Sequence, residues 1–401
     1  MPILIYSQSS KSNIPMNILH LLSWFPVPDN PTLGNFCIRQ IESLPEDCHS
    51  VILSVFEDPS LRESRVVDVE EHERYVYVKV RFRACRCASR WLGRLLRKWR
   101  TYRLYQYGLE YVKQHFFTPD FVHLHVSYPA GRIALRWKRR YKIPYLMTEH
   151  WTIYQPQNDA LLTGRLRRQV VKIGNNASII LPVSDDLRCN MERVGIQNRY
   201  QVIYNVVNTD RFTLPENRAK GEKVKMLHIS TLRDEAKNFS GLLRVVERLA
   251  QVRRDFELHV IHDYPAPQFE DYVRQNQLSD VVFFHGKQAP EAVADFFTKT
   301  DFFVLFSNFE NLPCVIVESF ASGVPVLSTR VGGIAEIVSP ERGVLVQAED
   351  ENALLEQMNY LLDHYDDYDR EAIRQYALKS FSMEEIGQQI YQQYKQLLKT
   401  L

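Results

Sequence analysis

The stretch "DFFVLFSNFENLPCVIVESFASGVPVLSTRVGGIAEIV", residues 301–338, predicts a strand, a loop, a helix and a second strand in that order. Its first apolar run, residues 302–306, is typical of a buried strand. Pro313 fits the first turn of the following helix, because the N–H that proline lacks would have no partner there. Gly323 then ends this helix. A helix that directly follows a buried strand indicates an α/β fold with a parallel sheet.

The same alternation of short apolar runs and longer helical patterns extends over the whole chain of 401 residues. This length exceeds what one hydrophobic core usually organises, so we expect two domains. The fold class predicted is α/β, with two doubly wound Rossmann-like domains that face a cleft. The strand-like runs are residues 18–22, 51–55, 76–80, 121–125, 145–148 and 178–183 in the first half, and 224–229, 257–261, 281–285, 301–306, 324–328 and 343–346 in the second half.

Composition places the domain boundaries. The polar segment "NTDRFTLPENRAKGEK" contains Pro215 and Gly221 and separates the last strand of the first half from the first strand of the second. Ser382 and Glu385 have capping-box spacing at the start of a terminal helical pattern. We therefore predict three parts, an N-terminal acceptor-side domain, a C-terminal nucleotide-binding domain and a helix that packs back toward the N-terminal domain, which are residues 1–207, 208–380 and 381–401.

Acidic side chains and unpaired amides meet at the helix start within residues 301–338. Glu310 lies at the strand-to-helix junction, and Glu318 lies on the helix within reach of the same ligand. Backbone amides around Asn311, Leu312 and Cys314 have no helical partner, and such amides favour an anion. Carboxylates accept hydrogen bonds from hydroxyl groups, whereas amides donate to phosphate oxygens. This combination indicates a sugar nucleotide as the ligand.

These residues resemble the signature of the retaining glycosyltransferases of family 4. That signature has two glutamates separated by seven residues, as Glu310 and Glu318 are, followed by segments similar to "SGVPVLST" and "VGGIAEIV". The segment "VIYNVVNTDRF" resembles the interdomain segment of the family, with Val206 where the family has glycine. The resemblance implies the two-domain GT-B fold and a nucleotide-diphosphate sugar as donor. It implies that Glu310 faces the transferred sugar and that Glu318 holds the ribose hydroxyls.

The segment "LHISTLRDEAKNFSGLL" resembles the phosphate-binding turn of the same family. Lys237 matches the family lysine, and Ser230 lies in the turn before it. The family arginine would fall on Thr231 or on the residue after it, so the pattern is broken there and Arg233 is the nearest substitute. The resemblance implies transfer without a metal, in which basic side chains neutralise the leaving diphosphate, and no cofactor besides the sugar nucleotide.

The first half contributes the opposite wall of the expected cleft. Gly34 and Asn35 start a helix after a Pro-rich loop, where the family usually has several glycines. His150 ends a strand and matches the family histidine that reaches the donor sugar. Asn205 lies where the chain crosses between the domains, and we expect it to contact the ligand or to fix the hinge. His125 has either a packing role or an acceptor-side role.

Basic residues are concentrated in one part of the chain. Eleven of the 50 Lys and Arg residues lie between Arg74 and Leu109, a stretch without Asp or Glu, which indicates an anionic partner. The segment from Arg90 to Arg103 places Trp and Leu on one helical face and most arginines on the other. This pattern fits a helix on an anionic membrane surface, and it fits equally well an ordinary helix that packs on a sheet.

The leader and the cysteines point to the cytosol. No apolar run is long enough to span a membrane, and residues 1–17 lack the features of a signal peptide. The six cysteines lack the spacing of zinc sites, so we expect reduced thiols. The expected location is the cytoplasm, either free or peripheral on the inner face of the membrane. The expected acceptor is a lipid-linked or polysaccharide molecule of the cell envelope.

Three other functions are compatible with parts of the pattern. A sugar-nucleotide epimerase on the same fold would consume the donor without an acceptor, and a non-catalytic partner of another transferase would only bind it. The mixture of arginine and aromatic residues in the basic segment permits nucleic-acid binding, but no RNA or DNA motif accompanies it. The spacing of Asp367 and Asp369 matches a metal-binding pair, but we interpret both as part of a solvated helix face because no strand precedes them.

Overall fold

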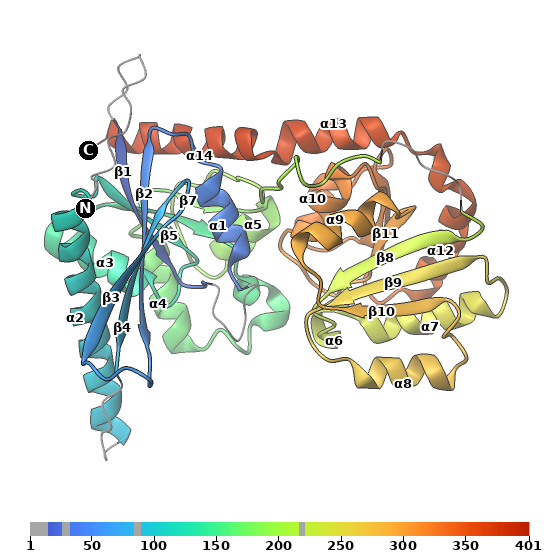
Figure 1. Ribbon diagram of the computed structural model, residues 1–401, viewed down its shortest axis with the longest axis horizontal. Helices are drawn as coiled ribbons and strands as arrows, with labels where there is room; N and C mark the ends of the chain where they lie inside the picture. The colour runs from blue at the N-terminus through green and yellow to red at the C-terminus, as the bar shows by residue number, and fades with distance from the viewer. Residues whose placement is uncertain (1–14, 26–32, 84–89, 216–220, 401) are drawn as a thin grey trace.

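The computed structural model describes residues 15–25, 33–83, 90–215 and 221–400. Two α/β domains lie next to each other, and the last two helices run along one side of both (Figure 1). The strands of the N-terminal domain are β1 Met16–Leu22, β2 Cys48–Glu57, β3 Arg65–Glu71, β4 Val76–Phe82, β5 Phe121–His125, β6 Tyr145–Glu149 and β7 Ile180–Pro182. The strands of the C-terminal domain are β8 Val224–Ser230, β9 Phe256–His262, β10 Val282–Gly286, β11 Phe302–Leu305, β12 Val326–Thr329 and β13 Gly343–Val346.

The two sheets have the strand orders β3-β4-β2-β1-β5-β6-β7 and β10-β9-β8-β11-β12-β13. Every neighbouring pair is parallel except β3 and β4. The twelve predicted strands are all present, but the sequence did not indicate β3. This antiparallel edge strand is rich in charge, and its Asp68 pairs with Arg81 of β4. Charged side chains of this kind keep an exposed edge from pairing with another chain.

Helices cover both faces of each sheet, as the predicted doubly wound architecture requires. The N-terminal domain contains α1 Asn35–Glu42, α2 Arg90–His115, α3 Gly131–Tyr141, α4 Gly164–Gly174 and α5 Asp185–Arg193. The C-terminal domain contains α6 Asp234–Lys237, α7 Phe239–Ala250, α8 Pro267–Gln275, α9 Pro290–Thr298, α10 Cys314–Ala321, α11 Ile334–Ile337, α12 Glu351–His364 and α13 Arg370–Phe381. Among the described residues, none of these helices has the length and apolar composition needed to cross a bilayer.

The final helix, α14 Met383–Leu398, belongs in space to the N-terminal domain. Its apolar face, which includes Ile386, Ile390 and Tyr394, packs with residues of β1 and β5. Ser382 caps the helix start by accepting a hydrogen bond from the Glu385 amide at 3.2 Å. The C-terminal segment therefore joins the two domains on the side shown at the top of Figure 1.

The strand order identifies where a ligand should bind. In doubly wound sheets, ligands bind beyond the carboxyl ends of the strands, where the strand order reverses direction. In the C-terminal sheet this reversal falls between the neighbouring strands β8 and β11, and in the N-terminal sheet it falls between β1 and β5. The residues that follow β8 and β11 are those that the sequence pattern singled out.

Candidate functional site

A lysine and a glutamate meet beyond the two central strands of the C-terminal sheet. β8 leads to α6, which ends at Lys237, and β11 leads into the loop that carries Glu310. The Lys237 Nζ contacts Glu310 Oε1, and this oxygen also accepts a hydrogen bond from Ser307 Oγ at 2.8 Å. The two charged side chains are only 18% and 9% exposed. A cation and a carboxylate thus converge at the switch point of the sheet.

The loop after Glu310 is held from the N-terminal domain. Asn205 Nδ2 donates a hydrogen bond to the Leu312 carbonyl oxygen at 2.6 Å. Asn311 Nδ2 donates to the His150 carbonyl oxygen at 2.7 Å. All four residues are buried. Asn205 therefore binds the loop of the other domain, which corresponds to the hinge-fixing alternative.

Gln155, a buried glutamine that the sequence pattern did not indicate, contacts this loop through several hydrogen bonds. Gln155 Nε2 lies within hydrogen-bond distance of the Glu310 carbonyl oxygen at 3.0 Å and of Asn311 Oδ1 at 2.9 Å. The same nitrogen lies 2.7 Å from Asp186 Oδ2 of α5. A single glutamine in a polar loop carries no spacing signal, so only the folded arrangement reveals its role.

Helix α10 starts beside Glu310 and presents amides to the domain interface. The helix begins at Cys314, and Pro313 is its N-cap. Pro313 thus lies just before the first turn, whereas the sequence pattern predicted a position inside that turn. No backbone carbonyl oxygen among the described residues accepts a hydrogen bond from the amides of Leu312 and Cys314. Glu318, one turn further along α10, is buried as well. The geometry at this helix start suits an anion.

An arginine from the other domain is bound to Glu318. Arg39 of α1 donates a hydrogen bond from Nη1 to Glu318 Oε1 at 2.7 Å, and the two side chains are 22% and 7% exposed. The ion pair thus connects the first helix of the N-terminal domain to α10. No local spacing could indicate this contact, because the partners are 279 positions apart.

His150 lies directly after β6 at the domain interface and is almost fully buried. Its ring lies 4.3 Å, between centroids, from that of Phe36. Burial lowers the pKa of His150 to about 3, although its contact with the Asn205 side chain acts in the opposite direction. Neither ring nitrogen has a hydrogen-bond partner of normal geometry among the described residues. A neutral imidazole with unused nitrogens at this position can bind a hydroxyl group of a ligand.

The start of α1 shows why a glycine is required there. Gly34 is the N-cap of the helix and has a φ of 76°. A Cβ at this position would overlap the Trp24 carbonyl oxygen. Asn35 is the first residue of the helix and is partly buried. Gly34 therefore lies against the backbone of Trp24. Residues 26–32, between them, lie outside the described part.

The turn after β8 holds Lys237 but does not bring Arg233 to it. Ser230 Oγ contacts His228 Nε2 at 2.8 Å and accepts a hydrogen bond from the Leu232 amide at 3.0 Å, so its hydroxyl group shapes the turn. The Arg233 side chain is 72% exposed and pairs with Glu235 at 3.5 Å. The structure therefore separates Arg233 from the buried pair of Lys237 and Glu310.

Two glycines let a second loop approach Glu310. Gly332 has a φ of 51°, and a Cβ there would overlap the Glu310 carbonyl oxygen. Gly333 donates from its amide to the Asn311 carbonyl oxygen at 2.6 Å. A Cβ on Gly333 would lie 2.6 Å from the Ser184 Cβ of the N-terminal domain. The segment "VGGIAEIV" is thus required by packing at the interface.

We expect Gly332→Ala to destabilise the protein and to displace the loop of Glu310. The left-handed backbone and the overlap with a carbonyl oxygen together cost about 1–3 kcal/mol or more. Thermal denaturation should show a lowered midpoint for the C-terminal domain. Gly164→Ala is the matched control, because an added Cβ at that exposed helix start has no neighbour within 4 Å. Equal midpoints for the two variants would contradict this account.

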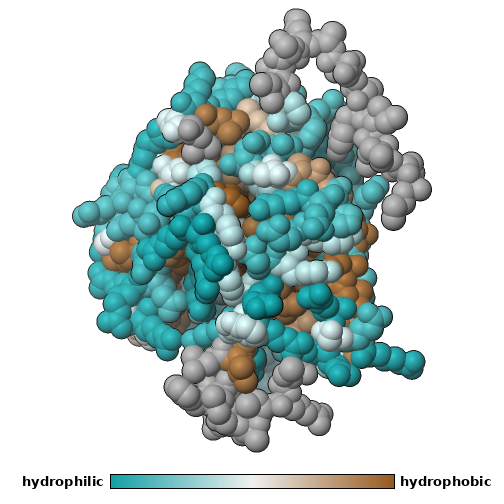
Figure 2. Space-filling view, turned by 90° about the vertical axis from the view of Figure 1, so that its left-hand side faces the viewer, coloured by the Kyte–Doolittle hydropathy of each residue, from teal (hydrophilic) through white to brown (hydrophobic). Residues whose placement is uncertain are grey.

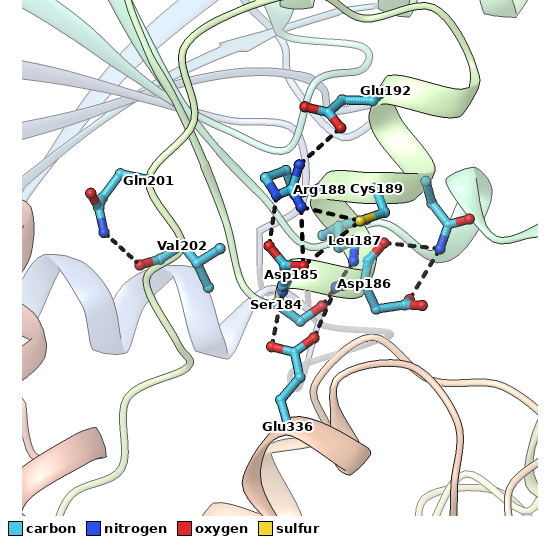
Figure 3. Close-up of polar contacts among 11 residues, drawn as sticks. Ser184, Asp185, Asp186, Leu187, Arg188, Cys189, Glu192, Gln201, Val202 and Glu336 are labelled. Atoms are coloured by element: carbon cyan, nitrogen blue, oxygen red, sulfur yellow. Dashed lines mark hydrogen bonds and ion pairs between the residues drawn. The ribbon is translucent and has the colours of Figure 1, made fainter.

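Another interdomain contact lies beside these glycines. Figure 3 shows Glu336 of α11 reaching from the C-terminal domain to the first turn of α5. Its two carboxylate oxygens accept hydrogen bonds from the amides of Asp185 at 2.9 Å and Asp186 at 2.8 Å. Burial raises the pKa of Glu336. A carboxylate at a helix N-terminus is favoured by the helix dipole, so this contact holds the domains together.

Three buried histidines form a polar cluster inside the N-terminal domain. His20, His123 and His125 extend from the adjacent strands β1 and β5. Among the residues that the structure describes, these three side chains lie close enough together to bind one metal ion. His20 Nδ1 lies 3.2 Å from His125 Nε2. Other ring nitrogens bond to hydroxyl groups, which are those of Ser50, Thr148 and Tyr394. These bonds engage both nitrogens of His20 and His123, so the cluster serves as a packed polar core.

The aspartate pair near the end of the chain has local partners. Asp369 is the N-cap of α13 and accepts a hydrogen bond from the Ala372 amide at 2.9 Å. Asp367 Oδ2 lies 2.9 Å from His364 Nδ1.

The described cysteines form no disulfide bonds. Cys37, Cys48, Cys189 and Cys314 are all free thiols. Cys85 and Cys87 lie outside the described residues.

Family models match the two domains separately. Residues 33–211 match the model described as Glycosyltransferase Family 4, and residues 210–380 match the model described as Glycosyl transferases group 1. The chain belongs to the family 4 glycosyltransferases. The predicted family is therefore confirmed, and the chain is an enzyme of the glycosyltransferase class. The boundary between the two matches falls where the chain crosses between the two sheets.

Curated relatives of this glycosyltransferase are identical to it at about a quarter of the aligned positions. An uncharacterized 41.2 kDa protein in the cps region of Klebsiella pneumoniae is 25% identical over 69% of this chain and 78% of that protein. The N-acetyl-alpha-D-glucosaminyl L-malate synthase of Bacillus anthracis is 26% identical over 61% of this chain and 65% of that enzyme.

Solved structures of low sequence identity share the fold. A sucrose-phosphate synthase of Thermosynechococcus elongatus superposes with a TM-score of 0.77 at 18% identity and covers 96% of this chain and 100% of that one. HepE of Anabaena in complex with UDP-glucose has a TM-score of 0.68 at 17% identity and covers 95% of this chain and 100% of that one. The fold of this glycosyltransferase is GT-B, as predicted.

Proposed function

We propose that this glycosyltransferase moves a hexose from a nucleotide-diphosphate sugar to a lipid-linked or polysaccharide acceptor, with retention of configuration and without a metal. The observation that carries the proposal is the buried contact between Lys237 and Glu310 beside the open amides of α10. A cation and amides suit a diphosphate, and a carboxylate suits sugar hydroxyls. HepE, which shares the fold, is solved in complex with UDP-glucose, and this supports a donor of that class.

Each residue has a role in this proposal. Lys237 and the amides at Leu312 and Cys314 neutralise the leaving diphosphate, in place of a metal ion. Glu310 and His150 hold hydroxyl groups of the transferred sugar from opposite domains, and the neutral imidazole of His150 can either donate or accept. The acceptor oxygen then attacks from the face that the diphosphate leaves. Glu318 holds the nucleotide ribose.

Names of relatives support an acceptor at the cell envelope. One relative is a protein in the cps region of Klebsiella pneumoniae, and another is the alpha-monoglucosyldiacylglycerol synthase of Streptococcus pneumoniae, 25% identical over 57% of this chain and 55% of that enzyme. The first name refers to a gene region and the second to a lipid product. A lipid-linked or polysaccharide acceptor for this chain agrees with both.

A screen of sugar nucleotides tests the donor. A donor at a hundred times its dissociation constant should add about 2.7 kcal/mol of apparent stability, which thermal denaturation detects. Release of nucleoside diphosphate is then measured with and without candidate acceptors. We expect release to rise with an acceptor and the anomeric configuration to be kept in the product, including in the presence of EDTA. An absence of stabilisation by every common sugar nucleotide would refute the proposal.

We propose in addition that α2 attaches the enzyme to an anionic membrane. Leu96 and Trp99 are 51% and 59% exposed, and Arg103 lies over the Trp99 ring at 5.0 Å. The later part of the helix is packed, as the buried Leu104 and Leu109 show. Figure 2 shows the face of the N-terminal domain that is at the left in Figure 1, where hydrophilic side chains surround separate apolar patches. Exposed aromatic and basic residues together favour a lipid surface.

The double variant Leu96→Ser/Trp99→Ser should bind phosphatidylglycerol vesicles about tenfold more weakly than the unmodified enzyme, because two large apolar side chains no longer enter the bilayer interface. Vesicle sedimentation at moderate salt measures this. Val252→Ser, at an 83% exposed position of the C-terminal domain, is the matched control. Equal binding to phosphatidylcholine and phosphatidylglycerol vesicles by the unmodified enzyme would remove the membrane proposal.

A further inference from the structure

The ion pair between Arg39 and Glu318 lies one turn after the start of α10, on the face that Cys314 shares. Cys314 and Glu318 are four positions apart, so their side chains lie on one face of the helix. Side chains in a helix lean toward its N-terminus, which directs the Glu318 carboxylate toward the first turn. Arg39 is hydrogen-bonded to that carboxylate at 2.7 Å, so its guanidinium lies on the helix face that leads to the first turn.

The surroundings of Cys314 agree with this placement. Desolvation raises the pKa of the Cys314 thiol to about 11, and the nearby positive charge of Arg39 opposes this rise. The guanidinium is thus close enough to Cys314, the first residue of α10, for their charges to interact. A guanidinium beside the positive end of a helix is unfavourable unless an anion compensates both. Glu318 supplies one negative charge there, and a diphosphate would supply more.

Lys237 and Arg39 therefore approach the same helix start from different domains. Lys237 reaches it on the side of Glu310, and Arg39 reaches it on the side of Glu318. Thr231 and the solvent-exposed Arg233 add no buried charge. We propose that Arg39 is a second cation that binds the donor diphosphate, so that the site is complete only when the N-terminal domain contacts α10. This inference rests on the proposed function and names a residue of the same site.

Nucleotide binding by the full-length enzyme tests this assignment, with UDP, GDP, ADP and dTDP and the matching monophosphates as probes in isothermal titration calorimetry. We expect Arg39→Gln to weaken binding of the preferred diphosphate about tenfold or more, because a charge-assisted contact is lost. Binding of the matching monophosphate should change much less. Arg39→Lys should restore part of the loss, and Arg248→Gln, at an exposed arginine of α7, should have no effect.

A second variant separates binding from folding. Arg39→Gln leaves Glu318 buried without its partner, whereas Arg39→Gln/Glu318→Gln removes both charges, so thermal denaturation of both variants reports any loss of fold. The proposal requires the double variant, when folded, to keep the larger loss for the diphosphate. Unchanged diphosphate binding by Arg39→Gln, or equal losses for monophosphate and diphosphate, would overturn it and leave Arg39 a structural partner of Glu318. If the unmodified enzyme binds none of the diphosphates, the proposed function itself fails.

Discussion

Glu310→Gln should lower kcat/KM for donor consumption by roughly 100-fold or more, which is the size of effect expected when one preorganised charged group is removed from a water-excluded site. The carboxylate is 9% exposed and its Oε1 contacts both Lys237 and Ser307. Glutamine keeps the size of the side chain but loses the charge. Release of nucleoside diphosphate from the donor that the screen identifies gives the measurement.

Binding measurements distinguish a role in chemistry from a general loss of structure. Nucleoside diphosphate should bind Glu310→Gln within a few-fold of the unmodified enzyme, because Glu310 is proposed to contact the sugar. Glu356→Gln, at an exposed position of α12, is the matched control and should be fully active. If Glu310→Gln retains full activity, Glu310 has been assigned the wrong role.

The second large effect is a loss of stability in acid, caused by buried neutral histidines. Burial lowers the pKa of His20, His150 and His228 to about 3 and lowers the pKa of His123 and His125 well below the usual value. The unfolded chain takes up protons near pH 6.5, whereas these folded groups do not. The unfolded state therefore binds more protons below pH 6.5, so the free energy of unfolding falls as the pH decreases from 6.5 toward 3.

Each such histidine removes about 1.4 kcal/mol per pH unit below 6.5, so five of them compete with the total stability of a typical domain within one to two pH units. Chemical denaturation at a series of pH values between 8 and 5 measures the slope. In His20→Gln the slope of the free energy of unfolding against pH should correspond to about one fewer proton taken up on unfolding, since one titrating group is removed. A free energy of unfolding that stays constant between pH 7 and pH 5 would show that these histidines are not buried in solution.

The order of strands and helices was predictable from local patterns. Apolar runs of strand length and helical spacings are visible in the sequence itself, and all twelve predicted strands exist. The edge strand β3 was missed because its charged residues hide the apolar alternation of Val67 and Val69. β3 pairs with β4 in antiparallel orientation, and charge pairs such as Lys79 with Glu70 connect the two strands. These cross-strand charge pairs form only in the folded sheet, so the sequence of β3 alone does not reveal them.

The sequence by itself determined the fold class, the family and the residues that one domain contributes to the candidate site, because Glu310, Glu318 and Lys237 lie at fixed spacings around strand ends. The sequence also indicated His150 and Asn205 of the other domain, but only the tertiary structure revealed the further contacts that this domain makes with the site. Arg39, Gln155 and the α5 amides reach the C-terminal domain over separations of 150 residues or more. Contacts between side chains so far apart depend on how two folded surfaces fit together, and no local spacing encodes that fit.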